Sequence, residues 1–120
     1  MIDYVQVYGS PSKADHFYVL YRLKIKTKEI KGTFADKYLI YENLVFVTEL
    51  ILQEKEGCGI LKYSSLECID INTFEKKSFS KIDDGYVYPL KIEGTKIIYT
   101  KQKKGSSAVH EFEQEIMGNG

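Results

Sequence analysis

Alternation of apolar and polar side chains with a period of two residues is the dominant pattern along this chain. In the clearest stretch one face of an extended segment is apolar and the other is basic, with Phe17, Val19, Tyr21, Leu23 and Ile25 opposite Arg22, Lys24 and Lys26. Because successive side chains of a strand point to opposite faces, this stretch predicts a β-strand with one buried face.

A second stretch, residues 44–52, is β-branched at its start and almost continuously apolar. Such a run is typical of a strand that is buried on both faces, and a short helix from Thr48 to Glu54 is the competing interpretation. Further strands are predicted from alternation and from β-branched and aromatic content at residues 59–63, 66–71, 76–79, 86–92, 96–101 and 108–115.

Polar or glycine-bearing turns separate these runs, as hairpin connections require. They are Glu42-Asn43, Asn72-Thr73, Asp83-Asp84-Gly85, Glu93-Gly94-Thr95 and Lys104-Gly105-Ser106. The first loop, residues 9–13, is longer and looser. The pattern as a whole predicts an all-β, antiparallel fold in a single domain over residues 1–117, followed by a flexible tail at residues 118–120.

Two pairs of segments repeat within the chain. Residues 20–31 align without a gap with residues 66–77, an offset of 46 (66 minus 20). Residues 40–48 align with residues 92–100, an offset of 52 (92 minus 40). A repeat of four short strands at this period has the size of a propeller blade rather than of a helical solenoid unit.

One repeated segment, Ile69-Asp70-Ile71-Asn72-Thr73-Phe74-Glu75, resembles the outer hairpin of β-propeller blades, in which the pattern Ile-Asp-x-x-Thr-Gly-Glu recurs. Residues 23–29 form a weaker copy. Both copies carry another residue where the pattern has glycine, Phe74 and Lys28, so we expect each turn to differ in type or to be strained.

The resemblance implies an outer hairpin at residues 17–34, one complete blade at residues 38–79 and a partial blade at residues 86–115. Closed propellers are built from about four to eight blades. We therefore expect open, propeller-like blades or a β-sandwich rather than a closed ring.

Composition and charge narrow the classes of function. Apolar residues make up 43% and charged residues 28% of the chain, as in ordinary globular proteins. Lys plus Arg equals Asp plus Glu at 17 each, so no net charge steers the chain toward nucleic acid or an anionic membrane. Without a secretion signal or a membrane-length apolar span, we expect a cytoplasmic location, in which Cys58 and Cys68 are two reduced thiols. A disulfide between them is the alternative.

Motifs that would carry chemistry are absent from the sequence, which has no phosphate loop, nucleotide fingerprint, nucleophile elbow or paired Cys motif. We expect no cofactor and no metal site. The best enzymatic interpretation is a small RNase-like enzyme in which His16 and His110 act as general acid and base, with Lys101 or Lys103 beside the phosphoryl group. Solvated surface histidines are the simpler interpretation.

The basic run 101–105 could contact a nucleic-acid backbone, and Tyr99 lies close enough in sequence to stack on a base. A solvated hairpin loop is the default interpretation of such a run. We therefore expect nucleic acid not to be the partner.

The blade interpretation places four loops at one end of the molecule, residues 35–36, 53–56, 81–84 and 101–105. Three of the four carry carboxylates, and Tyr86 and Tyr88 flank this edge. Acidic loops beside tyrosines suit a basic protein partner, and ordinary solubilising loops are the alternative. The candidate partner-binding residues are Asp36, Glu54, Glu56, Asp83, Asp84 and Tyr86.

A small β domain of this kind is similar in general type to the immunity proteins that neutralise interbacterial toxins, including those of contact-dependent growth inhibition systems. This resemblance implies a non-catalytic bacterial protein that covers the cationic active site of a toxin, for example a nuclease, and excludes its substrate. The alternative is a structural module, a propeller fragment that is completed by oligomerisation or by a strand of a partner. We expect a monomer or a weak homo-oligomer.

Overall fold

The computed structural model describes residues 5–10, 20–26, 28–55 and 58–116, and of residues 5–10, 20–22, 36, 54–55 and 58–60 it describes the backbone alone. The described residues form nine β-strands and no helix. The strands are β1 (Val5–Ser10), β2 (Leu20–Ile25), β3 (Lys28–Tyr41), β4 (Leu44–Lys55), β5 (Cys58–Asp70), β6 (Lys76–Asp83), β7 (Gly85–Glu93), β8 (Lys96–Lys103) and β9 (His110–Glu115).

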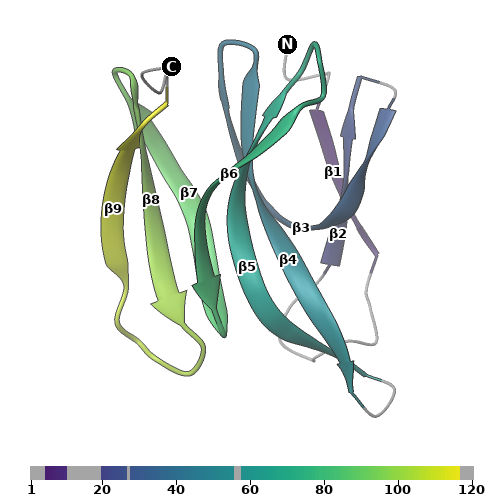
Figure 1. Ribbon diagram of the computed structural model, residues 1–120, viewed down its shortest axis with the longest axis vertical. Coiled ribbons are helices and arrows are strands. Elements are labelled where there is room, and N and C mark those ends of the chain that lie inside the picture. Colours follow the sequence, from purple (N-terminus) through teal and green to yellow (C-terminus); the bar gives the residue numbers. More distant parts are fainter. Residues whose placement is uncertain (1–4, 11–19, 27, 56–57, 117–120) are drawn as a thin grey trace.

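All of these strands pair in antiparallel fashion, and they form two sheets (Figure 1). Strands β1 to β6 form a six-stranded sheet in chain order, and β7, β8 and β9 form a three-stranded sheet. Within each sheet, every strand pairs with its neighbour in the chain, as connections that do not cross one another require. The predicted all-β, antiparallel fold class is confirmed.

The six-stranded sheet bends at β3, so that the molecule has three layers. The register between β3 and β4 shifts between Phe34 and Tyr38, and the strand sweeps from β2 to β4 across this irregularity (Figure 1). Irregular pairing of this kind bends and twists a strand locally. The first layer is β1, β2 and the beginning of β3, the middle layer is the end of β3 with β4, β5 and β6, and the third layer is β7, β8 and β9.

Two larger apolar cores lie on opposite faces of the middle layer, and a smaller cluster contains Ala35, Leu50 and Leu61. The first core, toward the first layer, contains Leu23, Ile25, Phe34, Val45, Val47, Ile69 and Ile71. The second core, toward the third layer, contains Phe46, Leu66, Cys68, Val87, Ile97, Tyr99 and Ile116. Burial of each large apolar side chain stabilises the fold by about 1.5–3 kcal/mol.

Strand β4 supplies alternate side chains to both cores, Val45 and Val47 to the first and Phe46 to the second. The prediction of a strand buried on both faces is confirmed. The competing helix from Thr48 to Glu54 is wrong, because this segment pairs residue by residue with β5.

Hydroxyl groups of the middle layer hold the third layer in place. Strand β7 pairs only with β8 within its sheet, which leaves the backbone groups of its other edge without a ladder partner. The Ser64 hydroxyl donates to the Gly85 carbonyl at 2.9 Å and accepts from the Val87 N–H at 3.0 Å, and the Thr48 hydroxyl donates to the Val87 carbonyl. These buried bonds satisfy the edge of β7, so the third layer docks on the middle layer at a fixed position.

The repeat at an offset of 52 corresponds to two hairpins of the same kind. Tyr41 pairs with Leu44 in one hairpin, and Glu93 pairs with Lys96 in the other. Each two-residue turn begins with a positive φ, 54° at Glu42 and 62° at Gly94. Turns with a positive φ match the twist of antiparallel strands, which explains why the two segments share a turn geometry.

The repeat at an offset of 46 departs from the propeller pattern in both ways that the sequence suggests. Phe74 takes the glycine position with a φ of 64°, a left-handed conformation that costs a non-glycine residue of order 1 kcal/mol. Lys28 instead lies in β3, and the first copy turns at Lys26, where φ is 58°. The second turn is therefore strained, and the first differs in type.

Asp70 supports the strained turn. Its Oδ1 accepts the backbone N–H groups of Asn72 at 2.7 Å and Thr73 at 3.1 Å, while its Oδ2 accepts the Asn43 side chain at 2.9 Å. The bonds from the Thr73 and Asn72 amides lower the pKa of the Asp70 carboxyl. The same residue therefore joins two neighbouring hairpins.

Several predicted boundaries are wrong. Residues 59–63 and 66–71 belong mostly to a single strand, β5, because Ser64 and Ser65 continue the ladder with buried hydroxyls instead of forming a turn. The turn at residues 83–85 is not a hairpin, since β6 pairs with β5 and β7 pairs with β8, and it is the corner between the two sheets. The division between hairpin and blade at residues 34–38 falls inside β3.

Other differences concern strand ends. Strand β2 begins at Leu20, and residues 17–19 lie outside the described residues, as do residues 11–13 of the first loop and the tail at 118–120. Strand β8 extends to Lys103, so only the last residues of the basic run 101–105 form a turn. Strand β9 begins at His110, two residues later than predicted.

Candidate functional site

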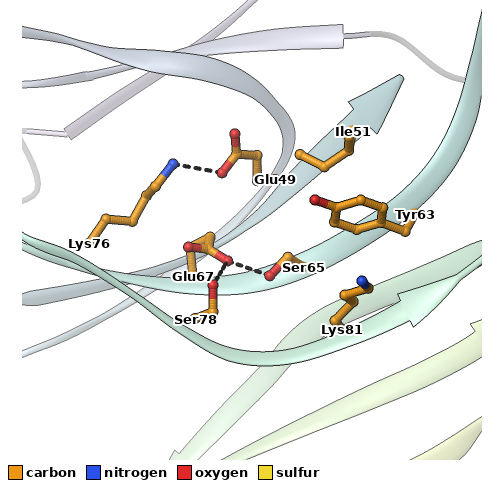
Figure 2. A pocket seen from close by; sticks show the side chains of 8 residues that line it. All are labelled: Glu49, Ile51, Tyr63, Ser65, Glu67, Lys76, Ser78 and Lys81. Atoms are coloured by element: carbon orange, nitrogen blue, oxygen red, sulfur yellow. Dashed lines mark hydrogen bonds and ion pairs between the residues drawn. The ribbon is translucent and has the colours of Figure 1, made fainter. Parts of the chain in front are cut away.

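A polar groove lies on the face of the middle layer that carries the first core. It occupies about 350 Å³ and is lined by strands β4, β5 and β6 (Figure 2). The lining residues are Glu49, Ile51, Tyr63, Ser65, Glu67, Lys76, Ser78 and Lys81.

The register of the middle layer explains where this groove begins. Across β4, β5 and β6, the apolar row ends at Val47, whose partner on β5 is already Glu67. In the next row Ser65 lies between Glu49 and Lys81. All of these side chains point to one face because cross-strand partners and every second residue of a strand share a face. The groove therefore starts where the first core ends.

Glu67 is the carboxylate at the floor of the groove, and only 4% of the residue is exposed. Its Oε2 accepts the hydroxyls of Ser65 and Ser78, the second at 2.7 Å (Figure 2). Among the described residues, no donor contacts its Oε1 and no cation forms an ion pair with it. Glu67 is thus a buried carboxylate with one oxygen for which the described residues supply no donor.

Glu49 forms the rim of the groove in an ion pair. Its Oε1 lies 2.8 Å from Lys76 Nζ, with 14% of the Glu49 side chain exposed (Figure 2). The backbone of β3 passes close to its other oxygen, because a Cβ on Gly32 would lie 2.7 Å from Glu49 Oε2. A Cβ there would force the Glu49 carboxylate to shift, and the φ of 133° at Gly32 favours glycine.

Tyr63 and Lys81 form the end of the groove nearest the corner between the sheets. Lys81 Nζ lies 4.3 Å from the centroid of the Tyr63 ring, a cation–π distance. Tyr63 is also the cross-strand partner of Asp83, whose carboxylate lies 4.0 Å from Lys81 Nζ. The groove therefore opens directly onto an exposed carboxylate.

The chemistry of this arrangement favours binding. The ion pair of Glu49 with Lys76 is neutral as a unit, and Lys81 lies beside Asp83, so Glu67 contributes an uncompensated negative charge. No histidine lines the groove, and no group of three or more His, Cys, Asp or Glu side chains in the described part of the chain could hold a metal ion. Nothing in this geometry indicates catalysis, and the open acceptors suit a ligand that carries a positive charge.

The predicted partner-binding residues lie in different parts of the fold. Asp83, Asp84 and Tyr86 are adjacent at the corner between β6 and β7, with both carboxylates exposed and Tyr86 half-buried. The φ of Asp84 is 49°, and its N–H donates to the Lys62 carbonyl at 3.0 Å. Tyr86 stacks on Tyr88 with the ring centroids 5.9 Å apart. Of the predicted carboxylates, Asp83 is the one that lies beside groove residues, Tyr63 and Lys81.

Of the other three predicted residues, the two with a described backbone, Asp36 and Glu54, lie in strands and not in loops. Asp36 lies within β3 and not in a loop, which corrects the prediction for residues 35–36. Glu54 is near the end of β4, where its backbone pairs with Gly59. The side chains of Asp36 and Glu54 and the whole of Glu56 lie outside the described residues.

The basic run serves the contact between the sheets. Lys101 Nζ donates to the Lys81 carbonyl at 3.1 Å, and Lys103 Nζ donates to the Asp83 carbonyl at 2.8 Å. Tyr99 is 6% exposed and lies in the second core, so it cannot stack on a nucleic-acid base. The structure therefore does not support a nucleic-acid site at residues 101–105.

The histidines do not form a described site. His110 is exposed at the start of the edge strand β9, and His16 lies outside the described residues. The prediction of a solvated histidine is confirmed for His110. The acid and base pair of an RNase-like enzyme stays a prediction without a described partner for His110.

Cys68 is a free, buried thiol in the second core. Burial raises its pKa to about 11, so it is unreactive at neutral pH. Cys58 pairs with Lys55 and Cys68 pairs with Phe46, at opposite ends of the same ladder. Ten residues of strand separate the two Cα atoms by roughly 30 Å, against the limit of about 7 Å for a disulfide. The alternative of a disulfide between them is wrong.

Sequence analysis missed the groove residues. Glu49 and Glu67 each interrupt a strongly apolar strand, and Ser64-Ser65 lies between two apolar runs where a turn was expected. A charged residue at a strand position that should face a core is the signal that could have found them, because such a position is kept only when the charge has partners.

Comparisons with known protein families, with curated proteins and with solved structures gave no match. The described residues contain no helix of the length and hydropathy needed to cross a membrane.

Proposed function

We propose that this chain is a non-catalytic protein-binding domain that docks a basic protein, and that its partner is a bacterial toxin whose active site it covers as an immunity protein. The observation that carries the proposal is the continuity of acceptors from the groove to the corner between the sheets. Asp83 is the cross-strand partner of Tyr63, so exposed and buried carboxylates follow one another along one face.

Charge complementarity provides the mechanism. Asp83 and Asp84 are exposed and would attract the cationic active site of a nuclease-like toxin during encounter. The half-buried Tyr63 is the cross-strand partner of Asp83 and would supply apolar contact area, as aromatic residues do at the centre of interfaces. Tyr86 packs against the cluster of Ala35, Leu50 and Leu61, so only its exposed part would add to this contact. Occupation of the toxin's active site would exclude its substrate without any catalytic step.

A structural module is the second candidate, and one observation favours it. Strand β9 is the outer strand of the three-stranded sheet among the described residues (Figure 1). Phe112 on this strand is 42% exposed although it stacks on the buried Tyr99. An open edge with an exposed aromatic side chain would accept another strand, as expected of a propeller fragment that is completed by a second copy or a partner.

The first test is co-purification of the tagged chain with the product of the reading frame immediately upstream, followed by calorimetric titration of the separated proteins. We expect a one-to-one complex with a dissociation constant on the order of 1 nM, equivalent to about 12 kcal/mol. The double variant Asp83→Asn/Asp84→Asn should slow association at least tenfold at low salt and much less at high salt, because the exposed charges act through steering.

The matched control is Glu111→Gln/Glu113→Gln, which removes the same charge from the exposed strand β9. This variant should leave the affinity for the toxin unchanged. Absence of a complex contradicts the proposal, and so does a complex that responds equally to both double variants. A native mass above that of the monomer, lost on mutation of Phe112, would instead support the structural module.

A further inference from the structure

The groove contains a carboxylate that the described part of the protein leaves incompletely compensated. Glu67 is 96% buried (4% exposed), two serine hydroxyls bind its Oε2, and its Oε1 has no donor among the described residues. A buried carboxylate in this position is costly unless a cation or further donors compensate it. A ligand that supplies both would relieve this cost.

The two lysines of the groove are engaged elsewhere. Lys76 forms its 2.8 Å ion pair with Glu49, and Lys81 lies over the Tyr63 ring at 4.3 Å and 4.0 Å from Asp83. Figure 2 shows Lys76 and Lys81 at opposite ends of the groove, with Glu67 and Ser65 between them. The centre of the groove therefore presents oxygen acceptors and no cation.

The walls of the groove indicate which cation would fit. Tyr63 offers an aromatic face whose present occupant, the Lys81 ammonium, is on a side chain that is 57% exposed and therefore free to move. A guanidinium group stacks on aromatic rings, is weakly hydrated and donates several hydrogen bonds in one plane. An ammonium group is a compact and strongly hydrated charge, so it gains less in a half-enclosed groove.

We propose that this groove is a binding site for one guanidinium group, supplied by an arginine side chain of the partner protein. The guanidinium would donate to Glu67 Oε1 and stack on Tyr63 in place of Lys81. The volume of about 350 Å³ accommodates an arginine side chain. The source of the arginine rests on the proposed function, but the guanidinium site itself can be tested without any partner.

The test is a titration of the ¹⁵N-labelled protein with Nα-acetyl-arginine N-methylamide, monitored by NMR. We expect saturable shifts confined to amides of β4, β5 and β6, with a dissociation constant on the order of 1 mM for this single residue. The citrulline analogue has the same shape without the charge, and it should bind at least tenfold more weakly. Free arginine, with its charged backbone groups, should bind no more tightly than the blocked form.

Glu67→Gln is the decisive variant, because its amide oxygen can still accept the hydroxyls of Ser65 and Ser78 while the charge is lost. It should weaken binding of the arginine probe at least tenfold with an unchanged melting temperature, whereas the control Glu113→Gln should bind as the wild type does. If Glu67→Gln fails to fold, Tyr63→Leu tests the same site, because loss of the stacking surface should also weaken binding severalfold.

Absence of saturable binding, equal binding of citrulline, or equal binding by Glu67→Gln would overturn the guanidinium site. Much tighter binding of free arginine would overturn the assignment to a partner side chain and point to a small guanidino compound. If the probe binds while no toxin complex forms, the proposed function fails and the site stands. If the complex forms, its affinity is unchanged in Glu67→Gln and the probe does not bind, the guanidinium site fails and the proposed function stands.

Discussion

Removal of the Ser64 hydroxyl should loosen the third layer from the middle layer. This hydroxyl makes two buried hydrogen bonds to the edge of β7, one to the Gly85 carbonyl at 2.9 Å and one from the Val87 N–H at 3.0 Å. Ser64→Ala deletes both without adding bulk. Ser64 and Val87 have no exposed surface, so water cannot replace the lost partner without rearrangement.

The expected magnitude follows from the number of groups left without a partner. A buried donor or acceptor that loses its partner costs about 1–3 kcal/mol, so two groups should lower the free energy of unfolding by about 2–6 kcal/mol. That loss is a large share of the total stability of about 5–15 kcal/mol that is typical of single domains. The second core should come apart before the first, because the hydroxyls hold only the third layer.

The assay is urea unfolding of the wild type, of Ser64→Ala and of the control Ser107→Ala, which changes an exposed serine. With a slope of about 2 kcal/mol per M, the midpoint should fall by roughly 1–3 M for Ser64→Ala. Hydrogen exchange of the Val87 amide should accelerate by the factor that corresponds to the same loss of free energy. A midpoint within about 0.3 M of the wild type, with Val87 still protected, would refute the role of Ser64 in docking β7.

The remaining predictions concern Gly32 and Cys68. Gly32→Ala should lower the free energy of unfolding by at least about 2 kcal/mol, because the new Cβ would lie 2.7 Å from Glu49 Oε2 in a backbone with a φ of 133°. In the same denaturation series the control Gly94→Ala, whose Cβ would meet nothing within 4 Å, should cost only about 1 kcal/mol, and equal losses would contradict the close approach at Gly32. Burial raises the pKa of Cys68 from 9.0 to about 11, so the unfolded state loses this proton first as the pH rises. The stability linked to the neutral thiol is complete below pH 9 and should fall by roughly 2–3 kcal/mol through pH 11. Cys68→Ala should remove this part of the pH dependence of urea unfolding measured under reducing conditions. If the wild type and Cys68→Ala lose the same stability between pH 9 and pH 11, the assignment to Cys68 is contradicted.

The strands of this fold could be predicted well, because their signals are local. Alternation and β-branched content depend only on neighbours in the sequence, and they placed β4, β7 and β8 to within three residues at each end. The repeat at an offset of 52 likewise reported a local geometry, the shared two-residue turn. The predictions failed where a polar residue had a tertiary partner, as at Ser64 and Ser65, which sequence patterns assign to a turn.

The candidate site could be predicted only in part. Asp83 was found because it is exposed in an acidic turn, which composition alone indicates. Glu67 and Glu49 were missed because each lies inside an apolar run, and their use depends on partners from other strands. Glu67 binds Ser78 on β6, and Glu49 binds Lys76, which is 27 residues away. No local pattern reports such a distance.

The sequence by itself determined that this chain is an all-β protein with antiparallel strands, hairpin turns and an apolar strand buried on both faces. It also identified the position in the second repeat where a non-glycine residue, Phe74, takes a left-handed turn. The reason is that strand periodicity and turn chemistry act between residues that are close in the chain.

Only the tertiary structure decided that the strands divide into two sheets at Asp84, that β3 bends between two layers, and that buried hydroxyls fix β7. It also decided that the polar residues of one face form a groove around Glu67. These features depend on which strands lie against one another and on where the first layer ceases to cover the middle one. The partners of a buried polar group come from across the molecule, so the structure of the whole chain is required to find them.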